Sequence, residues 1–107
     1  MYEPKLQTVL SVVKQELFAL YQDVLEAAIL YGSQARGDAR EYSDIDILVV
    51  LKSMLHPCEE MDRTLEVMSR ICLENDVVIS WQFVSSDRFN RQDSPFLLNV
   101  KRDGVVL

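Results

Sequence analysis

Two aspartates separated by a single residue, Asp44 and Asp46, stand at the start of the apolar run of residues 47–51. Alternate side chains of a strand point to the same face, so the two carboxylates share one face, roughly 6.6 Å apart along the chain. Carboxylates this close repel each other unless a cation lies between them. Mg²⁺ takes one or two protein carboxylates and completes its octahedron with water and substrate phosphates. The pair therefore predicts a divalent-metal site at the mouth of a strand.

A second feature upstream has the character of a phosphate site. The apolar run of residues 27–31 ends at Gly32-Ser33, which is typical of a buried strand followed by a tight turn. A glycine lets the backbone approach a ligand or take a positive φ, and Ser33 can present its N–H and hydroxyl to a phosphate. Residues 34–37 are expected to form a short helix there. The simpler alternative is that Gly-Ser and Asp44 serve only as turn and cap residues.

Both features lie in the string GSQARGDAREYSDIDILVV, residues 32–50. Gly-Ser, ten intervening residues and Asp-x-Asp resemble the signature of the DNA-polymerase-β-like nucleotidyltransferase superfamily. The fuller string is similar to its minimal nucleotidyltransferase (MNT) branch. A Gly-Ser pair alone would mean little, but the whole string with its spacing and flanking apolar runs is a specific signal. The resemblance implies the fold of the polymerase-β palm.

The resemblance also implies the reaction and its residues. In this family a hydroxyl attacks the α-phosphate of a nucleoside triphosphate, and pyrophosphate leaves. Asp44 and Asp46 would be the catalytic residues and the Mg²⁺ ligands, holding the metal against ATP. Gly32 and Ser33 would bind the nucleotide through its phosphates. The expected cofactor is Mg²⁺, and the expected substrate is ATP.

Two further positions leave alternatives open. Arg36 could bind the nucleotide, since a guanidinium suits bidentate phosphate contacts, or it could pair with Asp38 or Asp44 to hold the loop. Many members of the superfamily supply a third carboxylate from a later strand, and in ISWQFV this place falls on Ser80. Ser80 cannot replace an anionic base or ligand. Nucleotide binding without turnover is therefore the alternative to catalysis.

Proteins of the MNT branch commonly pair with a HEPN-domain protein, so the resemblance implies a HEPN toxin as partner and this chain as its antitoxin. The antitoxin would transfer AMP from ATP to a hydroxyl of the partner protein. Residues 1–107 are expected to form a single domain, with no room for a separate acceptor-binding domain, which favours a protein acceptor. Neutralisation by binding alone is the alternative, and transfer to a small molecule such as an aminoglycoside is a weaker one.

Composition narrows the classes of function. The net charge of −6 argues against non-specific nucleic-acid binding, which needs clustered Lys and Arg. No apolar run approaches membrane-spanning length, and residues 1–20 carry charges throughout, so a cytoplasmic protein without a signal peptide is expected. Cys58 and Cys72 are expected to be free buried thiols. His56 is interpreted as a solvated loop residue.

Periodicity places these residues on elements. Residues 59–73 are expected to form an amphipathic helix, residues 76–84 a half-buried strand, residues 88–90 and 95–101 two short helices, and residues 105–107 a terminal strand. The order of elements predicts an α/β (α+β) fold with a small mixed β-sheet and helices packed mainly on one face. A first amphipathic helix from Pro4 would bury Leu6, Val9, Leu10, Val13, Leu17 and Leu20, and the second Met61, Leu65, Met68 and Cys72.

Overall fold

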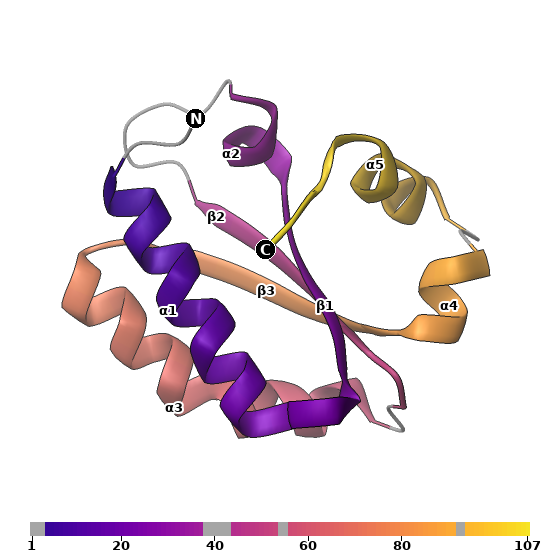
Figure 1. Cartoon of the computed structure of the whole chain (residues 1–107), viewed down its shortest axis with the longest axis horizontal. Helices are drawn as coiled ribbons and strands as arrows, with labels where there is room; N and C mark the ends of the chain where they lie inside the picture. Colours follow the sequence, from indigo (N-terminus) through magenta and orange to yellow (C-terminus); the bar gives the residue numbers. More distant parts are fainter. Residues whose placement is uncertain (1–3, 38–43, 54–55, 92–93) are drawn as a thin grey trace.

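The computed structural model describes residues 4–37, 44–53, 56–91 and 94–107 (Figure 1). Its helices and strands follow the order predicted from the sequence, and one short 3-10 turn, η1, is added before the first strand. They are α1 (Pro4–Tyr21), η1 (Gln22–Val24), β1 (Leu25–Tyr31), α2 (Gly32–Arg36), β2 (Ile45–Leu51), α3 (Pro57–Asn75), β3 (Ile79–Ser85), α4 (Ser86–Arg91), α5 (Pro95–Asp103) and β4 (Val105–Val106).

Local chemistry explains where several elements begin and end. The helix α3 begins at Pro57 rather than near residue 59, because proline fits the first turn of a helix. It ends at Asn75, and the next residue, Asp76, has a left-handed φ of 52°, which stops the helix; β3 then begins at Ile79. The hydroxyl of Ser94 accepts a hydrogen bond from the Leu97 N–H and caps α5, as its Ser-Pro start predicts.

The four strands form one mixed sheet in the order β3-β2-β1-β4. Strand β1 runs antiparallel to β2 and β4, whereas β2 and β3 are parallel and are linked by the helix α3. The register places Tyr31 of β1 beside Asp46 of β2, and Asp46 beside Ser80 of β3. The predicted mixed sheet is therefore confirmed, and it brings three strands together around Asp46.

The long helices α1 and α3 cover one face of the sheet, as predicted (Figure 1). Side chains of β2 alternate, so that Ile45, Ile47 and Val49 point into this core. The shorter helix α5 covers part of the other face, where Leu97 and Val100 complete a second cluster. The central strands are consequently buried on both faces. Within the described residues, no helix combines the length and apolar character that crossing a bilayer requires.

The buried faces of the two long helices differ in part from the prediction. At the end of α1, Tyr21 is buried while Leu20 is 39% exposed. In α3, Leu65 is 53% exposed, and the fully buried residue at this level is Thr64. Periodicity predicted burial of the two leucines because they are the more apolar side chains. The structure instead buries Tyr21 and Thr64, whose hydroxyl groups are hydrogen-bonded. Cys58 is exposed rather than buried, and both cysteines are free.

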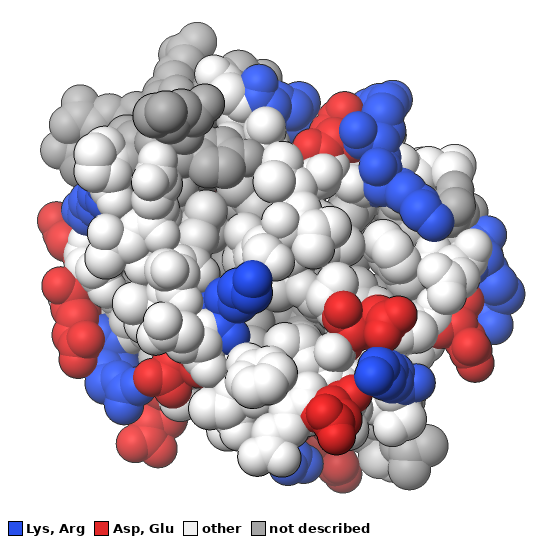
Figure 2. Space-filling view, in the orientation of Figure 1, with Lys and Arg blue, Asp and Glu red and all other residues white. Residues whose placement is uncertain are grey.

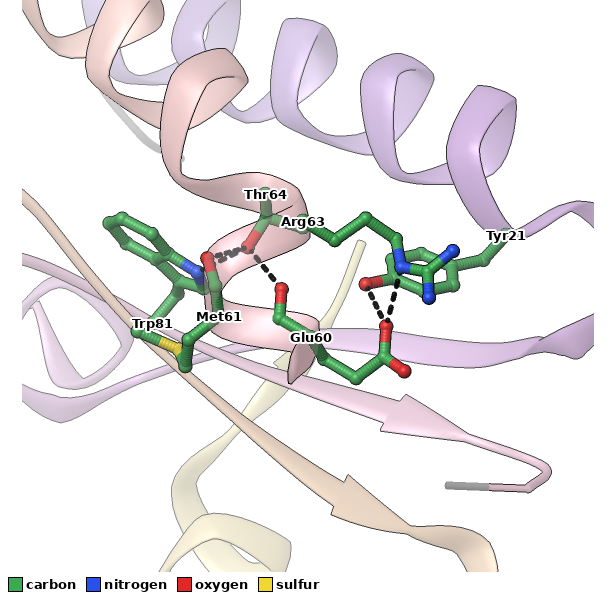
Figure 3. Close-up of polar contacts among 6 residues, drawn as sticks. All are labelled: Tyr21, Glu60, Met61, Arg63, Thr64 and Trp81. Atoms are coloured by element: carbon green, nitrogen blue, oxygen red, sulfur yellow. Dashed lines mark hydrogen bonds and ion pairs between the residues drawn. The ribbon is translucent and has the colours of Figure 1, made fainter. Parts of the chain in front are cut away.

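Two polar contacts fasten α3 to its neighbours (Figure 3). The Thr64 hydroxyl donates to the Glu60 carbonyl at 2.9 Å and accepts from the Trp81 indole N–H of β3 at 2.9 Å. The Tyr21 hydroxyl donates to the Glu60 carboxylate at 2.8 Å, and Arg63 pairs with the same oxygen at 3.2 Å. Burial and this carboxylate raise the pKa of Tyr21. The helix is thus joined to the sheet through Thr64 and to α1 through Glu60.

Replacing Thr64 with Val is expected to lower the free energy of unfolding by about 1–3 kcal/mol, because the Trp81 N–H is left without its acceptor. Thr64→Ser keeps the hydroxyl and is expected to cost less. Urea unfolding followed by circular dichroism, and by the fluorescence of the single Trp of the sequence, measures both losses. A loss in Thr64→Ser without a loss in Thr64→Val would show that packing of the methyl group, and not the hydrogen bond, stabilises this contact.

Candidate active site

Three elements meet at one end of the sheet: β1 ends at Tyr31, α2 begins at Gly32, and β2 begins next to Asp44. Gly32 has a φ of +73°, which favours glycine, and it lies directly against Asp46. A Cβ on Gly32 would lie 3.3 Å from the Asp46 Cγ and closer still to a carboxylate oxygen. The predicted tight turn therefore brings the backbone of α2 against the predicted metal ligand.

Asp46 lies on the face of β2 predicted from alternation. Asp46 is half-buried and shares the α5 face of β2 with Leu48, whereas Ile45 points to the opposite core. Asp44 is exposed just before the strand. Burial, followed by the charge of Asp44, raises the pKa of Asp46, and the positive charge of Arg36 opposes this rise. These effects place both carboxylates and the Arg36 guanidinium within one electrostatic neighbourhood.

The donor set suits a hard divalent cation. Two carboxylates that repel each other regain favourable interactions when a cation lies between them, and their oxygens are the ligands that Mg²⁺ prefers. Within the part of the chain that the structure describes, no group of three or more His, Cys, Asp and Glu side chains is arranged to hold a metal. The residues present thus fit an ion held by Asp44 and Asp46 that takes its other ligands from water and phosphate.

Arg36 supplies positive charge next to the candidate site. Arg36 acts on Asp46 and also helps to lower the pKa of Asp103, after Arg102. On the face shown in Figure 2, acidic and basic side chains are interspersed around a largely uncharged centre. The structure therefore leaves both roles of Arg36 open, phosphate binding and pairing with acids. Asp38, one of its predicted partners, lies outside the described residues.

The neighbouring strand carries no acid beside Asp46. The parallel register pairs Asp46 with Ser80, which is exposed on β3. The family resemblance predicts a third carboxylate at this position. The position is adjacent to Asp46, and in this chain it is occupied by the neutral hydroxyl of Ser80. Ser80 can form hydrogen bonds but supplies no negative charge.

Sequence reasoning missed an aromatic and amide wall of this site. Tyr31 closes the apolar run of residues 27–31, and its hydroxyl accepts a hydrogen bond from the Gln82 side-chain amide at 3.4 Å. Phe96 of α5 meets the Tyr31 ring edge-on, with centroids 5.3 Å apart and planes at 86°. Burial and the charge of Asp46 raise the pKa of Tyr31. The sequence signal was the position of Tyr31 immediately before Gly32, but its meaning depends on the strand register.

Replacing Asp46 with Asn is expected to raise the melting temperature at pH 7 when Mg²⁺ is absent. The pKa of Asp46 is higher in the folded chain than in the unfolded chain, so ionisation of its carboxyl favours unfolding. This cost grows as pH rises through the unfolded and then the folded pKa, and it is complete at neutral pH. The advantage of the Asn variant should therefore disappear below about pH 3.9, the ordinary pKa of Asp.

Added Mg²⁺ is expected to raise the melting temperature of the wild-type protein and to leave Asp46→Asn nearly unchanged. Asp62→Asn, which removes an exposed acid of α3, is the matched control and should respond to Mg²⁺ like the wild type. Differential scanning fluorimetry at several pH values measures all three proteins. An Asp46→Asn protein that is less stable than the wild type at pH 7 without Mg²⁺ would contradict the expected direction.

Known proteins place this geometry in a family. The family model "Polymerase beta, Nucleotidyltransferase" matches residues 15–107. Two proteins of Methanocaldococcus jannaschii, named "Putative protein adenylyltransferase MJ0141" and "Putative protein adenylyltransferase MJ0604", are 37% and 35% identical to this chain. The first match covers 63% of this chain and 67% of the relative, and the second covers 81% and 82%.

A solved structure named "Crystal structure of the toxin-antitoxin with AMP-PNP" has the same fold. It superposes with a TM-score of 0.58 at 19% identity, covering 87% of this chain and 68% of that one. This similarity agrees with the α/β fold and the mixed sheet predicted from the sequence. Because the family model spans most of the sequence and the second relative is matched over most of its length, the chain belongs to the polymerase-β nucleotidyltransferase family.

Proposed function

We propose that this protein is a Mg²⁺-dependent adenylyltransferase, which moves AMP from ATP to a hydroxyl of a partner protein. The observation that carries the proposal is the contact of Gly32 with Asp46 at the strand mouth where Asp44 also lies. A backbone turn suited to phosphate thus lies directly beside carboxylates suited to a metal. Membership of the nucleotidyltransferase family supports the reaction type.

The residues of the site have distinct roles in this proposal. Asp44 and Asp46 hold Mg²⁺ and so fix the position of the triphosphate, and Gly32 and Ser33 bind its phosphates. Arg36 contributes positive charge to the nucleotide-binding side. When bound, Mg²⁺ supplies neutralisation of the phosphate charge. The acceptor oxygen forms a bond to the α-phosphorus, the bond to pyrophosphate breaks, and the acceptor proton is released to solvent.

A protein acceptor is proposed from two findings. Both relatives from Methanocaldococcus jannaschii bear the name of protein adenylyltransferases. The similar solved structure is a toxin–antitoxin complex with AMP-PNP, an ATP analogue. We therefore propose that the partner is a toxin of the HEPN class, that this chain is its antitoxin, and that the toxin supplies the acceptor hydroxyl.

The test uses the tagged protein, purified from its native cell with whatever remains bound, and incubated with Mg²⁺ and ATP labelled at the α-phosphate. Label on a co-purifying protein, and no label when an Asp44→Asn/Asp46→Asn double variant is used, is the expected result. Mass spectrometry of the labelled protein then identifies the acceptor residue. Label of equal intensity with both proteins would contradict the proposal.

Ser80 favours a second candidate function, a nucleotidyltransferase fold that neutralises its partner by binding alone. A neutral residue beside Asp46 leaves the site without a third anionic group from β3. In this case the partner co-purifies unlabelled with both the wild-type protein and the double variant. Growth of cells that express the toxin would then be restored equally by the two proteins, which separates this candidate from the adenylyltransferase.

A further inference from the structure

The Tyr31 side chain crosses the sheet at the floor of the candidate site. Tyr31 is the register partner of Asp46 on β1, whereas Gln82 lies on β3 beside Leu48. The hydrogen bond between Tyr31 and Gln82 therefore spans β2 on the face that carries Asp46 and Leu48. The Tyr31 ring packs against the apolar cluster on this face, and its hydroxyl lies beside the Gln82 side-chain amide.

Two neighbours restrict where the Tyr31 hydroxyl can point. Phe96 packs edge-on against the ring, so that the ring is held from the α5 side. The Gln82 amide donates to the hydroxyl oxygen and therefore occupies one of its acceptor positions. A tyrosine hydroxyl has a single proton, which this hydrogen bond leaves available for another acceptor. Gln82 thus sets the direction in which Tyr31 can donate.

A donor in this position has a clear use during phosphoryl chemistry. Negative charge on the oxygens of the reacting phosphate must be stabilised in the transition state, and fixed donors in a partly buried site do this effectively. Tyr31 and Asp46 are register partners on neighbouring antiparallel strands, so their side chains leave the sheet next to each other on the same face. Ser80 and Gln82 are both exposed on the same face of β3, which keeps this side of the site open.

We propose that the Tyr31 hydroxyl, oriented by the Gln82 amide, donates a hydrogen bond to an oxygen of the phosphate that is attacked at the Asp44–Asp46 site. Tyr31 is then a catalytic residue, and Gln82 is a positioning residue that acts through it. This inference rests on the proposed nucleotidyl transfer and adds a contact for the nucleotide on the β1–β3 side. In this proposal β3 contributes the neutral side chain of Gln82 to the site, and not a third carboxylate.

Tyr31→Phe tests the donor, because it removes the hydroxyl and keeps the ring against Phe96. It is expected to lower kcat by about 10- to 100-fold while KM for ATP changes little. Gln82→Glu should cause a similar loss, because a carboxylate would accept the Tyr31 proton and turn the donor away from the site. Gln82→Leu should cause a smaller loss, and it should add nothing further in the Tyr31→Phe background.

The assay follows pyrophosphate release from Mg²⁺-ATP in the presence of the acceptor protein found by labelling. Binding of AMP-PNP by calorimetry and thermal unfolding serve as independent measurements, and both should match the wild type within error for Tyr31→Phe. Full activity in Tyr31→Phe would overturn the inference, as would a Gln82→Glu variant that retains wild-type kcat. A fall in AMP-PNP affinity with unchanged kcat would also overturn it, because the contact would then not belong to the transition state.

The failure of the proposed function gives a different pattern. A wild-type protein that binds AMP-PNP but releases no pyrophosphate with any acceptor would overturn nucleotidyl transfer and, with it, the role of Tyr31. A wild-type protein that turns over normally alongside an equally active Tyr31→Phe variant would overturn the role of Tyr31 alone.

Discussion

Replacing Asp44 or Asp46 with Asn is expected to slow AMP transfer by about 100-fold or more, the largest effect of any substitution in this chain. Asn keeps the size of the side chain but removes the charge that holds Mg²⁺ against the triphosphate. Asp46 should be the more sensitive of the two, because it is half-buried against Gly32, whereas Asp44 is exposed.

Single-turnover transfer with α-labelled ATP measures these rates, with Asp62→Asn as the control for loss of one acidic group. Asp62 is exposed on α3, which packs against the opposite face of the sheet. The control should retain the wild-type rate. Wild-type transfer by Asp44→Asn or Asp46→Asn would exclude the aspartate pair as the reacting centre.

Gly32→Ala is expected to reduce transfer by about 10-fold or more, with a loss of stability of about 1–2 kcal/mol from the positive φ alone. The added methyl group would lie against the Asp46 carboxylate and displace it. Gly37→Ala provides a matched control, because Gly37 has a similar φ of +80° at the other end of α2. A Cβ there meets no atom of the described residues within 4 Å.

The two glycine variants separate strain from contact. Both should lose similar stability in chemical denaturation, because both place alanine in the left-handed region. Only Gly32→Ala should lose transfer activity and the stabilisation by Mg²⁺. Equal activity losses in the two variants would mean that backbone strain in α2, rather than the contact with Asp46, explains the effect.

Much of the fold follows from local sequence patterns. Strand β2 alternates so that Ile45, Ile47 and Val49 face one core, and Asp46 faces the other side. This period of two determines on which face the carboxylates lie, whichever partners flank the strand. The predictions failed where two side chains of the same helix competed for burial. Thr64 is buried and Leu65 is exposed, because the Thr64 hydroxyl accepts a hydrogen bond from the Trp81 N–H. The spacing of apolar residues along a helix cannot predict such a contact with another element.

In the candidate site, too, some residues could be predicted from local sequence patterns and others could not. Gly32 and the aspartate pair could be identified from residue types and spacing, because a tight turn and a charged strand mouth are local features. Their roles in binding ATP and Mg²⁺ remain predictions that the experiments above test. Arg36 could not be assigned, since its interactions depend on which acids the folded chain brings near it.

The sequence by itself determined the order of the elements, the faces of the central strands and the turn at Gly32, since backbone preferences and side-chain alternation act over a few residues. Only the tertiary structure decided which residues surround Asp46. The parallel pairing of β2 with β3 places Ser80 beside Asp46 and carries Gln82 to the Tyr31 hydroxyl, and α5 adds Phe96. These contacts join residues that lie between 34 positions (Asp46 and Ser80) and 65 positions (Tyr31 and Phe96) apart. Long-range packing, which no local pattern encodes, sets their register.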